Sequence, residues 1–271
     1  MKCKIGFNTG MTEVSATEAE AATSGRSISP VPSLVQVFFP ERHTALAYYN
    51  DTFDLRRGDI VYVDGKLAGL QGRVVDVSLR FKIRISDYRR VIGLADTEVH
   101  GTFQPAGSYL LTFDPAALPF EKVITWYKPP VGAEEEYAAG DDGASFHLDD
   151  LSGMKADAPI IERGEKYYRE DRVVYLSIRG TRGRAIVEGT QPYELEFEYA
   201  DGEIRDLVCS CFCSGTCKHE VAAMLQLRES LALAERCCPG GFAASGALTA
   251  ITKIAFFSFV IDSRESGSIT V

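Results

Sequence analysis

Short runs of alternating apolar and polar residues dominate the first half of the chain, and Gly-containing turns separate them. Residues 34–39, 60–63 and 109–113 are runs of this kind, and Asp64-Gly65 is a typical hairpin turn. Residues 79–85 alternate strictly between an apolar face and a basic face. Strands this short and this frequent predict a small antiparallel, barrel-like β domain over residues 33–130.

The pattern changes in the second half, where a strand-like period is followed by a helical one. Residues 193–199 alternate glutamate with aromatic or aliphatic residues, as one strand of a β-hairpin does. Apolar residues then recur at roughly helical spacing, at Val221, Ala222, Met224, Leu225 and Leu231. The chain is therefore predicted to be an α+β, mainly β protein, with a barrel-like N-terminal domain and a C-terminal β-hairpin–loop–α module.

Three segments outside these patterns complete the predicted organisation. Residues 1–32 are rich in small and polar residues without a usable period, which predicts a disordered N-terminal arm. Residues 131–157 hold one Lys against eight Asp or Glu and predict an acidic linker before a module at residues 158–235. Residues 236–271 are left unassigned. Their apolar run, residues 246–260, is too short to span a membrane.

Four soft metal-binding side chains fall within eleven residues of the C-terminal module. Cys209 and Cys211 form a C-x-C pair, and Cys217 and His219 follow as C-x-H after five intervening residues. The strand period directs Cys209 and Cys211 to one face, while Cys217 and His219 come at a helix start, where the helix dipole favours thiolates. Three thiolates and one imidazole suit a closed tetrahedral site, so we expect one structural Zn²⁺ bound by these four residues.

The cysteines have other possible uses besides this ligand set. Cys213 is an alternative to Cys209 or Cys211 as a ligand, and we treat it as a spare thiol. A disulfide is disfavoured because the C-x-C spacing is too tight for a relaxed bond. The vicinal pair Cys237-Cys238 is a second metal-binding candidate, but no further ligands stand near it in the sequence.

The same residues resemble the SWIM-type zinc finger, whose pattern is C-x-C, a variable loop and C-x-H. Cys209, Cys211, Cys217 and His219 match its ligand positions. Upstream, residues 163–168 read Arg-Gly-Glu-Lys-Tyr-Tyr, similar to the R-G-x-x-Y-Y helix that often precedes such fingers. Phe212 stands where many members carry Pro. The resemblance covers about residues 158–235, under a third of the chain. It implies a zinc-dependent interaction module of the kind found with nucleic-acid enzymes and in stand-alone proteins, without catalysis of its own.

The usual sequence signatures of catalysis are missing. The chain has no phosphate-binding Gly-rich loop with Lys-Ser/Thr, no Gly-x-Ser-x-Gly elbow and no His-Glu-x-x-His. The remaining histidines, His43, His100 and His147, are expected at the surface. A zinc ion with four protein ligands also has no open position for a substrate. We therefore predict no enzymatic activity, and no small-molecule substrate is evident.

Charge decides between two kinds of partner. The formal net charge is −9, and a strongly acidic chain is a poor general polyanion binder. A protein partner is therefore expected, within an assembly that acts on nucleic acid. The alternative is direct DNA or RNA binding through the basic residues between Arg80 and Arg90 and between Arg179 and Arg184. Neither the identity of the partner nor the oligomeric state follows from the sequence.

Composition predicts the compartment. Apolar residues make up 45% and charged residues 25% of the chain, as in ordinary globular proteins. Seven cysteines clustered around one His fit a reducing environment, and no apolar stretch follows Lys2 and Lys4 as in a signal peptide. We expect a cytoplasmic protein, or a nuclear one in a eukaryotic cell, that is not secreted and has no membrane partner.

Overall fold

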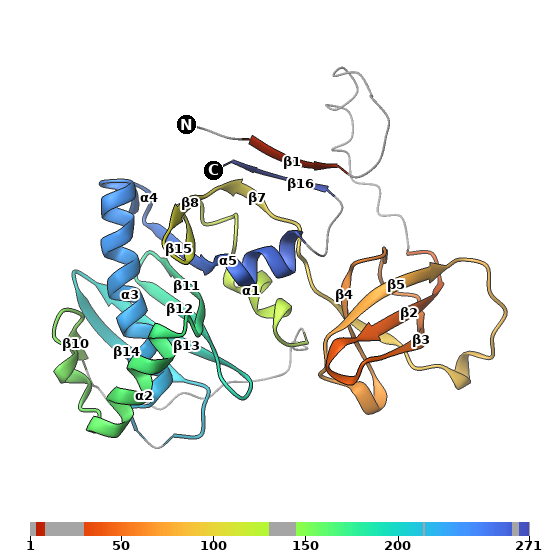
Figure 1. Cartoon of the computed structure of the whole chain (residues 1–271), viewed down its shortest axis with the longest axis horizontal. Coiled ribbons are helices and arrows are strands. Elements are labelled where there is room, and N and C mark those ends of the chain that lie inside the picture. Colours follow the sequence, from red (N-terminus) through yellow and green to blue (C-terminus); the bar gives the residue numbers. More distant parts are fainter. Residues whose placement is uncertain (1–3, 9–29, 130–144, 214, 262–265, 271) are drawn as a thin grey trace.

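The computed structural model describes residues 4–8, 30–129, 145–213, 215–261 and 266–270. Within these ranges the chain is a mixed α+β protein built mainly on three β-sheets (Figure 1). The predicted class, α+β and mainly β, is confirmed at this level. Residues 9–29 of the predicted N-terminal arm and residues 131–144 of the predicted acidic linker lie outside the described ranges.

A five-stranded antiparallel sheet forms the N-terminal unit, with the strand order β3-β2-β5-β4-β6. Its strands are β2 (Ser33–Phe39), β3 (Thr44–Asn50), β4 (Ile60–Val63), β5 (Gly72–Ser78) and β6 (Val91–Leu94). Val35 and Val37 of β2 and Val61 and Val63 of β4 are fully buried, as expected for positions two apart on one face of a strand.

This sheet does not close into the predicted barrel. Its edge strands β3 and β6 are not neighbours in the sheet order. In the described residues, an isolated bridge between Tyr49 of β3 and Arg90, just before β6, lies between these two edges. Residues 79–85, predicted as a strand, run through a surface loop instead. Phe81 in this loop packs edge-on against Tyr49, so this residue contacts the sheet without strand pairing, whereas Leu79 and Ile85 are exposed.

An eight-stranded antiparallel sheet forms the larger unit, in the order β10-β14-β13-β12-β11-β15-β9-β8. Its strands are β8 (Gln104–Ala106), β9 (Tyr109–Thr112), β10 (Ser145–His147), β11 (Val173–Arg179), β12 (Arg182–Glu188), β13 (Pro192–Ala200), β14 (Glu203–Cys209) and β15 (Ala247–Thr252).

Strand pairing in this sheet crosses the boundary that the sequence suggested at residue 130. β9 comes from the predicted barrel-like domain and β15 from the unassigned tail, yet the two strands pair with each other. β10, at the end of the predicted linker, pairs with β14. Every residue of β15 is buried, so this strand needs partners on both edges, which β11 and β9 provide. Local periodicity carries no information on such long-range pairing.

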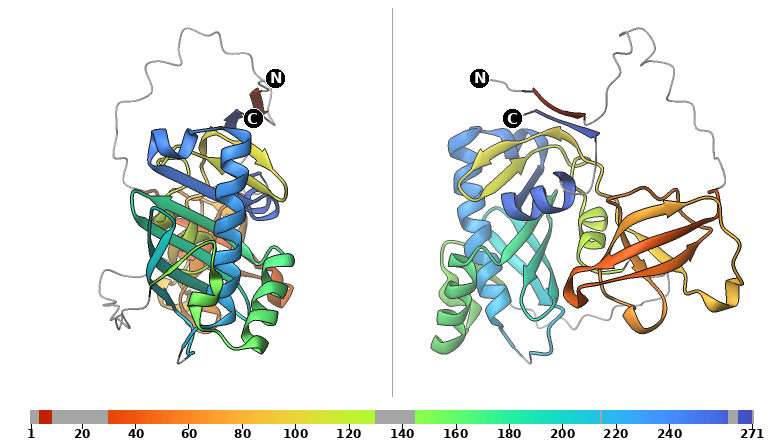
Figure 2. Two further views of the ribbon diagram at one scale, coloured as in Figure 1. Left: turned by 90° about the vertical axis from the view of Figure 1, so that its left-hand side faces the viewer. Right: turned by 45° about the vertical axis from the view of Figure 1, so that its right-hand side comes forward.

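Helices cover both faces of the eight-stranded sheet (Figures 1 and 2). On one face, α2 (Ala158–Arg169) and α3 (Lys218–Cys237) pack over a core that includes Leu176, Ala185 and Leu195. On the other face, α1 (Phe120–Val123) and α5 (Lys253–Phe256) pack with Tyr175 and Ile251. α4 (Gly241–Ser245) follows α3 directly. The other helical turns are η1 (Pro40–Arg42), η2 (Gly65–Leu67), η3 (Ile85–Asp87), η4 (Ile124–Trp126), η5 (Leu151–Met154) and the π turn η6 (Phe257–Ile261).

A three-stranded sheet brings the two ends of the described chain together (Figure 2). β16 (Ser266–Thr270) lies between β1 (Lys4–Asn8), to which it is antiparallel, and β7 (His100–Thr102), to which it is parallel. Part of the predicted disordered arm is therefore a strand in the structure.

The turn after α1 joins the two larger sheets. Trp126 in this turn is fully buried, and its indole N–H donates a hydrogen bond of 2.6 Å to the Asp96 carbonyl. Tyr62 of β4 donates its hydroxyl proton to the Thr125 carbonyl over 2.9 Å. None of the helices in the described part of the chain is both long and apolar enough to cross a membrane.

Candidate metal centre

The β13–β14 hairpin places the first pair of predicted ligands. Cys209 is the last residue of β14 and lies opposite Leu195 of β13. Beyond it, the Ser210 N–H donates to the Glu194 carbonyl and the Glu194 N–H donates to the Ser210 hydroxyl, each over 2.9 Å. These two bonds extend the hairpin past the end of the strand and fix the chain between Cys209 and Cys211.

The start of α3 places the second pair. Cys217 is the N-cap residue of this helix, and its backbone N–H donates to the Glu220 carboxylate over 2.8 Å. The Glu220 backbone N–H donates in return to the Cys217 sulfur, which completes a capping box with a thiol in place of the usual hydroxyl. His219 lies in the first turn, so its ring and the Cys217 sulfur come from the same helix end.

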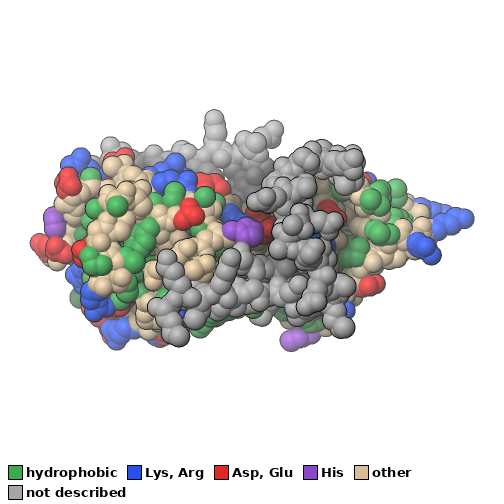
Figure 3. Space-filling view, turned by 90° about the horizontal axis from the view of Figure 1, so that it is seen from above, with side chains coloured by type: hydrophobic (Ala, Val, Ile, Leu, Met, Phe, Trp, Pro, Cys, Tyr) green, Lys and Arg blue, Asp and Glu red, His purple; other side chains and the backbone are tan. Residues whose placement is uncertain are grey.

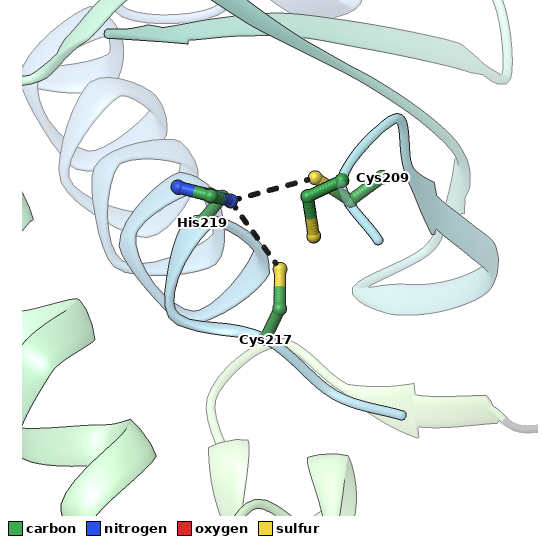
Figure 4. Close-up of side chains that lie close together, drawn as sticks. Cys209, Cys217 and His219 are labelled. Atoms are coloured by element: carbon green, nitrogen blue, oxygen red, sulfur yellow. Dashed lines mark hydrogen bonds between the residues drawn. The ribbon is translucent and has the colours of Figure 1, made fainter. Parts of the chain in front are cut away.

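The four predicted ligand side chains converge at one point, which we call the Cys/His corner. The sulfur atoms of Cys209, Cys211 and Cys217 and a ring nitrogen of His219 all lie within 4.8 Å of one another. His219 Nδ1 is 3.7 Å from both the Cys209 and the Cys217 sulfur (Figure 4). In a tetrahedral zinc site, a sulfur and a nitrogen ligand are about 3.6 Å apart. The geometry therefore fits a four-coordinate metal ion.

Burial and ring stacking fix the imidazole. The His219 side chain is 3% exposed, stacks on Tyr193 with 4.1 Å between ring centroids, and meets the Tyr167 ring edge-on at 5.5 Å. Its Nε2 atom is buried and has no hydrogen-bond partner among the described residues. With Nδ1 directed at the sulfurs, the ring has the orientation that a metal ligand at this position would need.

The thiols are electrostatically coupled. A hydrogen bond from Cys209, with help from His219 and the Glu220 N–H, holds the pKa of Cys217 well below its usual value. The same contact and burial raise the pKa of Cys209, and burial raises the pKa of Cys211. The pKa shifts of Cys209 and Cys217 are opposite because the Cys209 thiol stabilises the charged form of Cys217. A bound cation would remove this difference, because it stabilises all three thiolates at once.

Helix α2 supports the corner from outside. Its Gly164 lies against α3 so closely that a Cβ atom there would be 2.5 Å from the Val221 side chain. Lys218 lies over the Tyr167 ring of α2 at 4.6 Å, and the Thr216 hydroxyl donates to the Met154 carbonyl over 2.6 Å. The start of α3 is thus held by α2 and by η5, the helical turn that precedes α2 and contains Met154.

The other sequence candidates lie apart from this cluster or at its margin. Cys213 is exposed, and the Phe212 side chain beside it has a relative exposure of 108%. The exposed side chains of His43, His100 and His147 agree with their prediction as surface residues. The residues that sequence reasoning missed are Glu220, Tyr193 and Tyr167. A C-x-x-E capping pattern could have indicated Glu220, whereas nothing local marks the two tyrosines as neighbours of His219.

The two predicted basic clusters differ in their ion pairs. Arg182 pairs with Glu196, and Arg184 pairs with both Glu196 and Glu121 at 2.8–3.0 Å. Arg179 donates to the Pro115 carbonyl beside a shallow cavity of about 130 Å³. In the loop after β5, Arg90 pairs with Asp51. The remaining cations of that loop are exposed and form no ion pair with a described acidic residue: Arg80, Lys82, Arg84 and Arg89.

No family model, curated protein or solved structure matches this chain. The Cys3His cluster, which could hold a metal ion, is therefore the strongest functional indication in the described residues.

Proposed function

We propose that this protein binds one structural Zn²⁺ through Cys209, Cys211, Cys217 and His219, in a SWIM-type module that recognises a protein partner. The observation that carries the proposal is the convergence of exactly these four donors, from a hairpin end and a helix start, within 4.8 Å. Sulfur and imidazole donors in tetrahedral array favour zinc over the hard cations, which prefer oxygen. Four protein donors leave no position for a substrate, so the ion serves structure and not catalysis.

The arrangement of elements supports the proposed SWIM-type module. Helix α2, which contains Arg163-Gly164, precedes the strands β11, β12, β13 and β14, and the C-x-H pair opens α3. Gly164 has a physical role in this order, because only a residue without Cβ allows α2 and α3 to approach so closely. The ion would hold the β13–β14 hairpin against the start of α3 and so stabilise the module. The residues around the ion would orient its ligands.

The surface of the corner supports a protein partner. Phe212 is fully exposed between two cysteines, and an aromatic side chain held in this way is a typical anchor at protein interfaces. The chain is acidic overall, with a net charge of −9, which disfavours nucleic acid as the general partner. We propose that the metal holds the loop and that the loop presents Phe212 to the partner, within an assembly that acts on nucleic acid.

Native mass spectrometry of the full chain tests the ligand set. We expect one zinc ion per wild-type chain, and none after Cys217→Ser or His219→Ala. Cys213→Ser and Cys237→Ser are the matched controls, since both thiols are exposed, and both variants should keep the ion. A wild-type chain that takes up no zinc after refolding with zinc contradicts the proposal. Zinc loss in Cys213→Ser would contradict the ligand assignment.

Interaction with a partner is tested at Phe212. Cross-linking in the source cells should give a partner with the wild-type chain that Phe212→Ser loses. Leu79→Ser is the control, because Leu79 is also an exposed apolar residue, at 63%, in the loop after β5. Equal loss in both variants would show that the contact does not depend on the corner.

A second candidate function is direct nucleic-acid binding, and the unpaired cations of the loop after β5 favour it. Lys and Arg side chains project from the end of the molecule that the five-stranded sheet forms (Figure 3). The loop cations are available for phosphates, whereas Arg182 and Arg184 are already neutralised by glutamates. Phe81, however, packs on Tyr49 and is not free to stack on a base.

Fluorescence anisotropy with labelled single-stranded and double-stranded DNA and RNA over a salt series tests this second function. If it operates, the combined change of Arg80, Lys82 and Arg84 to Ala should weaken binding and lower the salt slope by about three. Arg179→Ala with Arg182→Ala should change little. Absence of binding at low salt removes this function.

A further inference from the structure

We propose that the cavity beside the β11–β12 hairpin binds a carboxylate group that carries a short aliphatic chain. The cavity lies on the face of the eight-stranded sheet that α1 covers, because Phe120 of α1 and Tyr175 of β11 are among its lining residues. Helices α2 and α3 cover the opposite face, so this inference does not depend on the proposed metal site.

The hairpin brings three arginines to one side of the sheet. Residues 177–184 read Ser-Ile-Arg-Gly-Thr-Arg-Gly-Arg, and alternate residues of a strand point to the same face. Arg179 lies opposite Arg182 across the hairpin. Ser177 lies opposite Arg184 in the same pairing. All four residues line the cavity, so the local sequence gathers three cations and one hydroxyl group around it.

The neighbouring strand β15 completes this part of the lining with small side chains. Thr249 stands opposite Ser177, and Ala247 stands opposite Arg179. Both residues of β15 line the cavity, as does Phe120 of α1. The short side chain of Ala247 leaves open the space beside Arg179. The lining therefore combines cations, hydroxyl groups and apolar surface, which suits an oxyanion attached to a hydrocarbon group.

The ion pairs at the cavity leave one cation uncompensated. Arg182 and Arg184 both pair with Glu196, and Arg184 also pairs with Glu121 at 3.0 Å. Arg179 donates to a backbone carbonyl and forms no ion pair with a described acidic residue. Three arginines against two glutamates leave an excess of one positive charge.

This balance of charge favours a carboxylate over a phosphate group. A carboxylate carries one negative charge and neutralises the excess, whereas a phosphate monoester carries about two at neutral pH and would reverse it. The next acidic residue of β13, Glu198, stands opposite both Arg182 and Arg205 and is not among the residues that line the cavity.

A buried donor without an acceptor also points to a ligand. The Nε atom of Arg184 is buried and has no hydrogen-bond partner among the described residues. The Arg184 guanidinium lies 4.6 Å from the centre of the Phe120 ring, and its two terminal nitrogens are held by Glu121 and Glu196. A buried polar group without a partner costs free energy, and a ligand oxygen beside Nε would give this donor its acceptor.

The size of the cavity limits the ligand. Its volume is about 130 Å³. A water molecule takes up about 30 Å³ of liquid water. The cavity therefore has room for a carboxylate group with one or two carbon atoms, which is either a small free acid or the carboxyl end of a peptide.

NMR titration of the full chain with propionate tests the proposal. We expect saturable shifts of the backbone amide signals of Ser177, Arg179 and Thr249. Arg179→Gln keeps the length of the side chain and breaks no ion pair with a described residue, and it should weaken propionate binding about tenfold. Arg84→Gln is the matched control and should bind as wild type, because Arg84 is also exposed and unpaired with a described acidic residue but lies in the loop after β5.

Two peptides distinguish the sources of the carboxylate. If N-acetyl-trialanine with a free C-terminus binds about tenfold more tightly than propionate, the ligand is a peptide end; equal or weaker binding assigns the cavity to a free acid. The same peptide with a C-terminal amide should not bind. The proposal is overturned if neither acid gives saturable shifts, if the amide binds as well as the acid, if inorganic phosphate binds more tightly than propionate, or if Arg179→Gln binds propionate as the wild type does.

Discussion

The five-stranded sheet and the Cys/His corner differ in what fills their interiors. In the sheet, Val35, Val37, Val61 and Val63 are fully buried, and apolar contact alone accounts for their packing. In the corner, the buried groups are a thiol and an imidazole, and the Nε2 atom of His219 has no partner in the described residues.

Under the proposed function, this difference means that the Cys/His corner depends on a bound metal ion and the five-stranded sheet does not. Buried apolar side chains are stabilised by leaving water, so the sheet needs no ligand. Buried polar groups cost free energy unless they find partners, and a metal ion gives a partner to three sulfurs and one nitrogen at once. We therefore expect removal of metal to destabilise the Cys/His corner and to leave the five-stranded sheet unchanged.

The largest effect is expected from loss of the metal. Cys217→Ser or a strong chelator should lower the stability of the corner by more than about 4 kcal/mol, because structural zinc supplies binding energy comparable to the stability of a whole domain. Thermal unfolding monitored by Trp126 fluorescence and by circular dichroism would show the change. Val61→Ala should instead destabilise the five-stranded sheet and leave the zinc content unchanged.

A smaller effect is expected from two matched glycine substitutions, one in each region. A Cβ atom at Gly164 would lie 2.5 Å from Val221, and one at Gly72 would lie 2.2 Å from Val37. Each change to Ala should destabilise its region by about 1–3 kcal/mol through overpacking. Only Gly164→Ala should also weaken zinc binding, as measured by competition with a chelator of known affinity. Equal zinc affinity in both variants would show that α2 does not support the ligands.

The stacked tyrosine should contribute less. Tyr193→Leu removes the ring that lies 4.1 Å from His219 and should weaken zinc binding by about 1 kcal/mol, the usual contribution of an aromatic pair. Tyr48→Leu removes a ring of the same kind, which lies 5.9 Å from Phe39 in the five-stranded sheet. It should cost comparable stability without any change in zinc affinity, as chelator competition would show.

The smallest effect is expected at Lys218. Its ammonium group lies 4.6 Å from the centre of the Tyr167 ring, and a cation–π contact between partly exposed side chains such as these contributes about 1 kcal/mol. A double-mutant cycle of Lys218→Ala and Tyr167→Leu measures this coupling directly. A coupling energy of zero would mean that the contact does not help to hold α2 against α3.

The convergence of the four candidate ligands could be predicted from the sequence because the information for it is local. C-x-C at a strand end and C-x-H at a helix start require only the two periodicities and a short loop, and the structure brings these four residues together. The helix that begins beside Cys217 and the strands before it were predictable for the same reason. That the chain is α+β and mainly β also followed from the pattern.

What could not be predicted depends on contacts between distant segments. β9 and β15 are far apart in the sequence, and only their pairing shows that residues 109–112 belong to the larger sheet. The strict alternation of residues 79–85 predicts a strand, but Phe81 finds its apolar contact on Tyr49 without strand pairing. The rings of Tyr167 and Tyr193 reach His219 from α2 and β13, and local pattern cannot show such an approach.

Hydrogen–deuterium exchange of the full chain, with and without a zinc chelator, tests the central claim most directly. It reads both regions in one sample. We predict that chelation accelerates exchange in β13, β14 and the first turns of α3, while β2, β4 and β5 keep their protection. Unchanged protection at the Cys/His corner after complete removal of zinc would contradict it.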